Sequence, residues 1–282
     1  MKNLDNFPTL KQKLNQANLN IILFPQELNE WQNFSKEEQD TKMQRICTLP
    51  ICGEDFTAAY TLYFRLKWLD AFKTCTTQKS PAVLEVGAGS STNIPNALTI
   101  LDPTSKYVTA NMNKKLTAEF KQNTAHLPIS INVIEDDANN ICKHFPPNSF
   151  DAIVFEHSVN DVLQAMLCEK AGMDTTHSDW WDILPDMIKL INAEYANQAL
   201  EQSVKAEFLS LVENCLTVLK PGGYLIASHY MFQYDLDLGY NPELWQNILP
   251  QVRPWLKELT TATEEIIDEF DPQWWLFLKK QA

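Results

Sequence analysis

Positively charged residues are scarce in this chain of 282 residues, which has 23 lysines and arginines against 36 aspartates and glutamates and a net charge of −13. An acidic surface repels phosphate backbones, so a nucleic-acid partner would need a local basic patch. The densest cationic stretch is Lys114-Lys115, with Lys121 nearby, and its spacing is typical of a solvated helix face. We therefore expect no nucleic-acid partner.

Long apolar runs are missing as well. No segment approaches the roughly 20 apolar residues that span a membrane. The N-terminal stretch MKNLDNFPTLKQKLNQ has no apolar segment of signal-peptide length. The six cysteines are scattered without a C-x-x-C pair, which favours reduced thiols over a disulfide framework or a metal site. We expect a cytoplasmic protein with no membrane partner and no metal.

From residue 82 onward, strand-like and helix-like patterns alternate. Five strands are expected at 82–86, 106–111, 129–134, 150–155 and 224–229, separated by helices at 114–123, 138–144, 159–171 and 204–219. This alternation implies βαβ crossovers and a parallel sheet covered on both faces. Two more candidate strands, 262–270 and 273–278, are joined by so short a connection that they must be antiparallel. The expected fold is α/β and Rossmann-like, doubly wound, with a mostly parallel seven-stranded sheet and a C-terminal antiparallel hairpin.

Helical segments precede and interrupt this alternation. Residues 1–53 are predicted to form a helical N-terminal extension, and residues 54–282 a single α/β domain that begins with a helix rich in aromatic residues. Two insertions, at about 172–202 and 232–259, interrupt the alternation of strands and helices.

Glycine is rare, and two of the seven glycines stand close together in VLEVGAGSS. Gly87 and Gly89 fall on the turn after the first strand, at the sheet edge where ligands bind in open α/β folds. Glycine permits a positive φ and close approach of a ligand to the backbone, although a tight turn alone explains a G-x-G pattern equally well. Neither a third glycine nor a Gly-Lys-Ser/Thr end follows, so a dinucleotide fingerprint and a P-loop are excluded. Glu85, expected to point into the same crevice, favours a positively charged ligand.

At these residues the chain resembles the class I S-adenosylmethionine-dependent methyltransferases, over roughly residues 54–282. The resemblance is carried by four short motifs, EVGAG at 85–89, VIEDDA at 133–138, FDAIVFEH at 150–157 and LKPGGYL at 219–225. The closing hairpin also fits the strand order of that family. The resemblance implies S-adenosylmethionine as cofactor and S-adenosylhomocysteine as its product.

The resemblance also implies a set of cofactor-binding residues around these motifs. Asp137 matches the position that presents an aspartate to the adenine amino group. Asn111 stands where the family usually has an acid that holds the ribose hydroxyls, so its contact would lack charge assistance. The cofactor-binding residues expected are Tyr60, Tyr63, Glu85, Gly87, Ala88, Gly89, Ser90, Asn111, Met112, Asp136, Asp137, Ala138 and Glu156.

The candidate catalytic residues are His157, Asp161 and His177. Methyl transfer from a sulfonium is an in-line displacement, and a base is needed only if the acceptor must lose a proton. Two roles fit His157 equally well: a general base, and a hydrogen-bonded residue near the adenine. Asp161 is a base or amine anchor, or simply a residue of the first helical turn.

The insertion at 172–202 resembles a substrate lid of this family and contains HSDWWD at 177–182. Its two tryptophans suit either an aromatic pocket wall or an anchor to the core. A metal site built from His177, Asp179 and Asp182 ranks low, because their spacing matches no known metal-binding pattern.

We expect methyl transfer to an O or N atom of a small-molecule acceptor. Acidic residues near the expected pocket favour an acceptor that bears an amine. Two alternatives stay open at this point. One is a non-catalytic protein that binds the cofactor or its product, motivated by Asn111. The other is an aminopropyltransferase on the same fold, for which two adjacent aspartates would be expected where this chain reads EHSVND.

Overall fold

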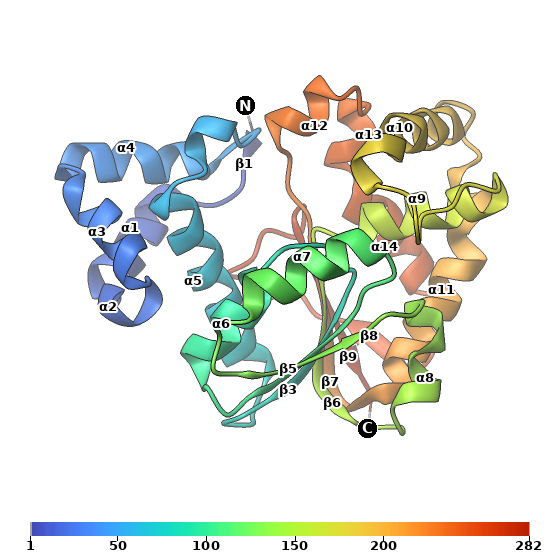
Figure 1. Cartoon of the computed structure of the whole chain (residues 1–282), viewed down its shortest axis with the longest axis horizontal. Helices are drawn as coiled ribbons and strands as arrows, with labels where there is room; N and C mark the ends of the chain where they lie inside the picture. Colours follow the sequence, from blue (N-terminus) through green and yellow to red (C-terminus); the bar gives the residue numbers. More distant parts are fainter. Residues whose placement is uncertain (1, 282) are drawn as a thin grey trace.

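The computed structural model describes residues 2–281, and a seven-stranded sheet forms its centre (Figure 1). Its strand order is β5-β4-β3-β6-β7-β9-β8. The strands are β3 (Ala82–Val86), β4 (Lys106–Ala110), β5 (Ser130–Ile134), β6 (Phe150–Glu156), β7 (Leu219–Ser228), β8 (Ala262–Glu264) and β9 (Trp275–Lys280). Strands β3 to β7 are parallel, and β9 pairs antiparallel with both β7 and β8. The fold predicted from the sequence is confirmed.

Three of the predicted strands differ from the structure by two residues or more, and the one expected at 273–278 is β9 (Trp275–Lys280). Strand β8 ends at Glu264, so the expected strand 262–270 is wrong beyond that residue. Phe270 turns inward instead and packs its ring 4.8 Å from that of Trp275. Strand β7 begins at Leu219, because Leu219 already pairs with Phe150 and the Pro-Gly-Gly segment forms an irregularity inside the strand.

Helices cover both faces of the sheet, as a mostly parallel sheet requires (Figure 1). Helix α5 (Ala58–Cys75) packs against α6 (Asn93–Leu101), whereas α11 (Leu200–Val218) packs against α8 (Ile141–His144), α9 (Val159–Lys170) and α14 (Ile248–Leu256). The other helices of this region are α7 (Lys114–Thr124), α10 (Trp180–Ala196), α12 (Gln233–Asp237), α13 (Pro242–Gln246) and the 3-10 turn η2 (Ala138–Asn140). Every residue of β6 is buried, so the core runs through the middle of the sheet.

Four helices precede α5, namely α1 (Phe7–Gln16), α2 (Leu19–Ile22), α3 (Pro25–Asn33) and α4 (Lys36–Ile46), together with the short pair β1 (Lys2–Asn3) and β2 (Thr48–Leu49). They pack on α5, where the buried guanidinium of Arg65 forms two hydrogen bonds with Glu27, at 2.6 and 2.9 Å. The predicted boundary between residues 53 and 54 falls inside the 3-10 turn η1 (Gly53–Asp55).

Candidate functional site

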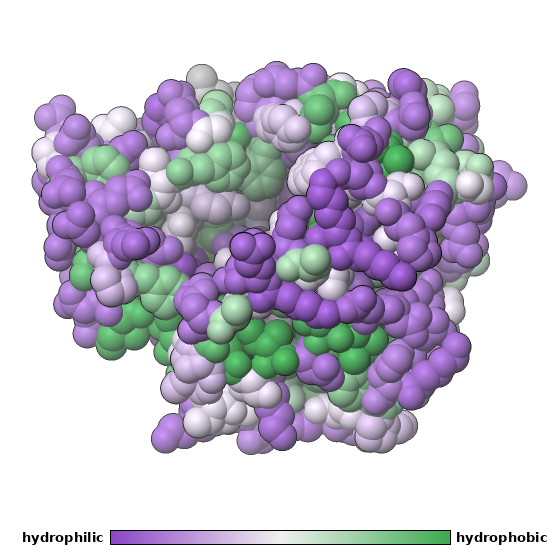
Figure 2. Space-filling model, viewed as in Figure 1, coloured by the Kyte–Doolittle hydropathy of each residue, from purple (hydrophilic) through white to green (hydrophobic). Residues whose placement is uncertain are grey.

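A cavity of about 810 Å³ opens beyond the carboxyl ends of the parallel strands. Strand β3 pairs with β4 on one side and with β6 on the other. The strands before β6 extend the sheet in one direction from β3, and those from β6 onward extend it in the other, so the chain changes direction at β3. Ligands in open α/β sheets bind at such a switch point. Figure 2 shows that hydrophilic residues dominate this face of the molecule, with a recess between the N-terminal helices and α7.

The two glycines of the first turn have left-handed backbones, with φ of +70° at Gly87 and +58° at Gly89. A Cβ on Gly87 would lie 3.3 Å from the Cβ of Ser158, which is tighter than an ordinary contact. A Cβ on Gly89 would meet only the side chain of Leu116, at 3.9 Å. Gly87 is therefore constrained by conformation and by space, and Gly89 by conformation.

Neighbouring elements hold this turn in place. The N–H of Gly87 donates to the carbonyl of Ala110 at 3.0 Å, and the hydroxyl of Ser158 donates to the carbonyl of Val86 at 2.6 Å. Ser158 immediately precedes α9, so the end of β3 is tied to both the end of β4 and the start of α9.

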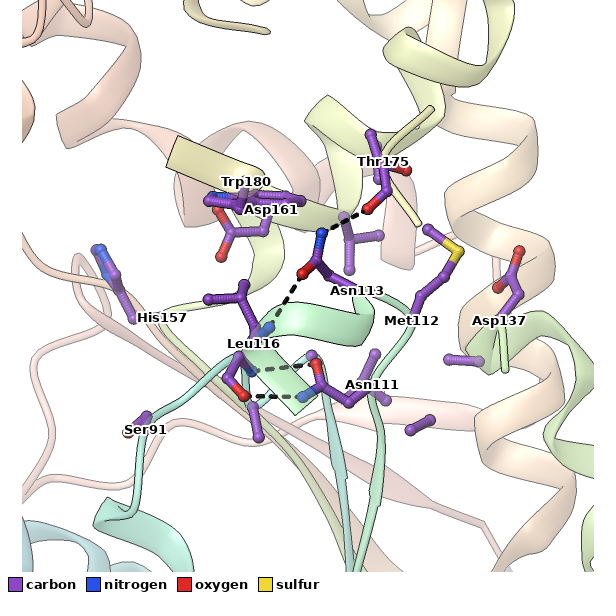
Figure 3. Close-up of a pocket in the computed structure, with 18 of the residues that line it drawn as sticks. Ser91, Asn111, Met112, Asn113, Leu116, Asp137, His157, Asp161, Thr175 and Trp180 are labelled. Carbon is purple, nitrogen blue, oxygen red and sulfur yellow. Dashed lines mark hydrogen bonds between the residues drawn. The ribbon is translucent and has the colours of Figure 1, made fainter. Parts of the chain in front are cut away.

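Asn111 holds the same turn from the end of β4 (Figure 3). Its Nδ2 donates to the carbonyl of Gly89 at 2.8 Å, and its Oδ1 accepts from the N–H of Gly89 at 3.3 Å. The side chain is only 3% exposed, so both bonds are shielded from water. Each polar atom of the Asn111 side chain is thus bonded to Gly89, where the resemblance predicts a residue that faces a ribose.

Two adjacent aspartates follow β5, and the structure distinguishes them. Both oxygens of Asp136 are occupied: Oδ1 accepts from the N–H of Asp137 and from Asn140, and Oδ2 lies 2.8 Å from Nε2 of His144. The bond with His144 is the main reason that the pKa of Asp136 is lowered. Asp137 accepts one bond through Oδ1, from the N–H of Asn139 at 2.8 Å, and lines the cavity. Asp137 is therefore the better placed of the two to bind a ligand.

Apolar and backbone groups complete this part of the cavity. Ala88 and Ser90 line it from the glycine turn, Met112 from the segment after β4, and Ala138 from η2. Figure 3 shows the Met112 side chain on the same side of the cavity as Asp137. These groups leave a half-apolar slot, which suits a flat ring with a polar edge.

Glu156, the last residue of β6, connects three donors around the glycine turn. Its carboxylate accepts hydrogen bonds from Ser91 and Asn93, both at 3.1 Å, and from the hydroxyl of Tyr230. Burial raises the pKa of Glu156, although the three donors act in the opposite direction. Glu156 and Tyr60 both line the cavity.

His157 and Asp161 lie on the side of the cavity away from Asp137 (Figure 3). The ring of His157 stacks on those of His229 and Tyr230, with centroids at 4.6 and 4.9 Å. Burial and the neighbouring His229 lower the pKa of His157 well below its usual range. Its Nδ1 accepts from the N–H of Tyr230 at 3.4 Å, so the neutral ring carries its proton on Nε2, which faces Asp235 at 3.9 Å.

Asp161, in the first turn of α9, has a different environment. Burial, and then the negative charge of Asp235, raise its pKa to about 8. Burial also raises the pKa of Asp235 to about 6, and Asp235 accepts a hydrogen bond from Nε1 of Trp245 at 3.0 Å. Asp161 can therefore exchange a proton near neutral pH.

Three of the residues predicted for the site lie outside the cavity lining. Glu85 is 1% exposed and accepts a hydrogen bond from Tyr107, because its side chain packs within the sheet layer instead of reaching the crevice. Tyr63 is 1% exposed and faces Asp5, with 3.5 Å between their oxygens, because it lies on the side of α5 covered by the N-terminal segment. His177 pairs with Asp174 and its side chain is 62% exposed. The predictions that placed these three side chains in the site are wrong.

The insertion at 172–202 reaches the cavity through Asn113. Asn113, which caps α7, donates from Nδ2 to the carbonyl of Thr175 at 2.8 Å (Figure 3) and to the carbonyl of Ser178 at 3.0 Å. Lys114 and Thr176 add a backbone bond of 3.0 Å. The only sequence signal for Asn113 is its helix-capping position. Through these bonds the insertion brings Trp180 and Trp181 to the cavity wall, where Trp181 is 50% exposed.

The cavity lining is acidic. It includes seven carboxylates and neither lysine nor arginine: Asp136, Asp137, Glu156, Asp161, Glu169, Asp174 and Glu207. Among residues 2–281, no three His, Cys, Asp or Glu side chains gather as they would around a metal ion. In the same span no helix has both the length and the apolar character needed to cross a bilayer.

Solved structures similar to this chain include a SAM-dependent methyltransferase from Aquifex aeolicus, 14% identical with a TM-score of 0.48, the match covering 76% of this chain and 88% of that one. A SAM-dependent O-methyltransferase from Thermotoga maritima is 11% identical, covers 86% and 71%, and has a TM-score of 0.43. An rRNA methylase from Streptococcus thermophilus is 13% identical, covers 76% and 94%, and has a TM-score of 0.41. No protein-family model matches the sequence, and no curated protein matches it. The assignment of the fold rests on the strand order and register of this chain.

Proposed function

We propose that this chain binds S-adenosylmethionine in the cavity and transfers its methyl group to an O or N atom of a small-molecule acceptor. The observation that carries the proposal is the left-handed glycine turn at the switch point of the sheet, facing a cavity that extends from Asp137 to His157 and Asp161. A turn of this kind lets the backbone approach a ligand closely.

The residues of the cavity fit this cofactor chemically. The backbone of Gly87 to Ser90 would hold the methionyl part, and Asp137 the adenine amino group. Glu156 adds an acidic side chain beside the turn. Because the cofactor carries a sulfonium and an ammonium group, an acidic lining without lysine or arginine favours its binding.

When bound, the cofactor supplies an electrophilic methyl group on a positively charged sulfur. The task of the protein is to align the acceptor with that methyl group and to exclude water. Tyr60, Trp180, Tyr230 and Phe232 line the part of the cavity around His157 and provide an apolar wall for the acceptor. His157 is neutral and positions this wall by stacking on Tyr230.

The acidic lining also supports a small-molecule acceptor over a nucleic acid. A phosphate backbone that entered the cavity would meet seven acidic side chains and no lysine or arginine. A non-catalytic cofactor-binding role is the second candidate, since Asn111 replaces an acid and is bonded to Gly89. An aminopropyltransferase would prefer the decarboxylated cofactor.

Isothermal titration with S-adenosylmethionine and with S-adenosylhomocysteine tests the proposal, followed by an assay for production of S-adenosylhomocysteine with a panel of acceptors. We expect micromolar binding and turnover. No binding at millimolar ligand would refute the proposal. Binding without turnover of any acceptor would favour the non-catalytic role, and turnover only with the decarboxylated cofactor would favour aminopropyl transfer.

A further inference from the structure

Asp161 occupies the end of the cavity that the cofactor-binding residues leave open. Figure 3 shows it on the same side as Trp180 and His157, away from Asp137. Nδ2 of Asn160 donates to Oδ1 of Asp161 at 2.7 Å. Within residues 2–281 no hydrogen bond to its Oδ2 is found, so this oxygen is available to a ligand.

Aromatic rings surround this end of the cavity. Tyr60, Trp180 and Phe232 line it, and the ring centroid of Phe232 lies 6.4 Å from that of Tyr60 and 5.0 Å from that of His157. Ring faces attract cations, most strongly where water is excluded. His157 does not compete with a cation, because its pKa lies well below the usual range and the ring stays neutral.

No positive side chain balances Asp161 inside the cavity, since the lining lacks lysine and arginine. Asp235 of α12 is the charged group that raises the pKa of Asp161 from another element, and it is negative when ionised. Tyr240 on the same side is buried and bonded to Gln164, at 2.9 Å, and its pKa is raised, so it stays neutral. A cation beside Asp161 would therefore meet the Asp161 carboxyl group, with the charge of Asp235 acting on the same site and no lysine or arginine in the lining.

We propose that the methyl acceptor is an amine, and that Asp161 both binds its nitrogen and takes the proton that this nitrogen must lose. The inference deepens the proposed function and rests on it. An ammonium group has no lone pair, so it cannot attack a methyl carbon until a proton has left.

The transfer balances as follows. The proton passes from R–NH₃⁺ to the carboxylate of Asp161, which leaves R–NH₂ with a free lone pair. That lone pair forms the new C–N bond while the C–S bond breaks, and its electron pair stays on sulfur. The products are a protonated secondary amine and the neutral thioether S-adenosylhomocysteine.

The proton affinity of Asp161 suits this role. An alkyl amine has a pKa of about 10, so transfer to an ordinary carboxylate is uphill by about six pKa units. Burial and Asp235 raise the pKa of Asp161 to about 8, which reduces the difference to about two. The same environment leaves most of the Asp161 population protonated near neutral pH, so a bound cation must displace a proton.

Benzyltrimethylammonium tests the binding half of the proposal, because it carries a fixed charge and cannot be methylated. We expect wild-type protein saturated with S-adenosylhomocysteine to bind it, and Asp161→Asn to bind it at least ~10-fold more weakly. Wild-type affinity should rise about tenfold per unit of pH below about pH 8, with proton release, whereas Asp161→Asn should show no such dependence. Asp182→Asn, at an exposed position on α10, is the matched control and should behave as wild type.

Equal affinity of wild type and Asp161→Asn for the cation would overturn the proposal, as would the absence of binding to wild type at ~10 mM. Asp161→Asn is nearly isosteric and should keep the melting temperature and the affinity for S-adenosylhomocysteine. If S-adenosylhomocysteine fails to bind to wild type, the proposed function fails, and titration of the cation into ligand-free protein still tests Asp161.

Turnover tests the other half. Benzylamine, benzyl alcohol and benzoate share a ring and differ in the reacting group. We expect benzylamine to be methylated in preference to the other two, with a rate that rises through about pH 8, and Asp161→Asn to lower kcat far more than it changes the KM for S-adenosylmethionine. Preference for the alcohol or the carboxylate would refute an amine acceptor.

Discussion

Replacing Asn111 by aspartate separates two roles that this residue could have. The change restores the acid that the family resemblance leads one to expect at the end of the second strand of the fold. A residue that faces the ribose would gain charge-assisted hydrogen bonds, and cofactor affinity would increase. A residue that holds the glycine turn would lose its donor to the carbonyl of Gly89, now at 2.8 Å.

The structure favours the second role, in which Asn111 holds the glycine turn, and it indicates how much stability the substitution should cost. In Asn111→Asp the Nδ2 donor becomes an oxygen that faces the Gly89 carbonyl, at a site only 3% exposed. An unsatisfied buried polar group costs about 1–3 kcal/mol. A loss of about 2 kcal/mol would lower the melting temperature of the ligand-free protein by about 4–8 °C. If the turn must be reordered on binding, the same energy would weaken cofactor affinity by about 30-fold.

The effect should depend on pH with a definite sign. A protonated aspartate can still donate to Gly89, so the folded state raises the pKa of the introduced carboxyl above its unfolded value. The stability of the variant should therefore approach that of wild type below about pH 4 and fall as the pH rises through the folded pKa. Differential scanning calorimetry from about pH 4 to 8 measures this trend.

Two variants control the experiment. Asn111→Ala removes both bonds to Gly89 and should also destabilise the protein, without the pH dependence. Asn123→Asp changes an exposed amide that bonds the carbonyl of Ser90 at 3.4 Å, and should alter stability by less than about 0.5 kcal/mol. Tighter binding of S-adenosylhomocysteine by Asn111→Asp, with an unchanged melting temperature, would refute the role in holding the turn.

Three further substitutions test other parts of the site. Gly87→Ala should cost about 1–2 kcal/mol, because φ is +70° and the new Cβ meets Ser158, and calorimetry should show no such loss in Gly53→Ala, where the space is open. Glu85→Gln should raise the melting temperature near pH 8 and not near pH 4, since burial raises the pKa of Glu85 well above its usual range; an equal shift at both pH values would contradict a buried, protonated carboxyl. Asp137→Asn should weaken S-adenosylhomocysteine binding about tenfold in titration calorimetry, and an unchanged affinity would remove Asp137 from the adenine site.

Much of the sheet was predictable because buried parallel strands are short apolar runs bounded by turn residues. Strands β3 to β6 lie within one residue of the ranges expected from the sequence. The C-terminal hairpin was harder. Ile266 and Ile267 extend the apolar pattern after β8, yet Ile266 is 62% exposed and the chain turns there. Local pattern cannot tell a strand residue from one that turns to cover a neighbouring ring, as Phe270 does.

For the site, the turn residues of the sequence predicted which segments lie at the cavity better than they predicted which side chains point into it. The glycines, Ser90, Met112 and Asp137 line the cavity because they follow strand ends, and strand ends meet at one edge of the sheet. Glu85 and Tyr63 lie close to the same edge in sequence, but their side chains face the interior, and only tertiary packing decides that.

Asn111, Ser158 and Glu156 together explain how a turn with two glycines is held in shape. Asn111 comes from the end of β4, Ser158 precedes α9, and Glu156 ends β6, so three elements adjacent to β3 each bond the segment from Val86 to Asn93. Two of these three residues are neutral, and the acidic one is surrounded by donors. The segment therefore keeps its left-handed backbone without a charged group directed at the cavity from β4. The two bonds from Asn111 fix the turn at Gly89 before any ligand binds, and a turn that is already ordered loses less conformational entropy on binding.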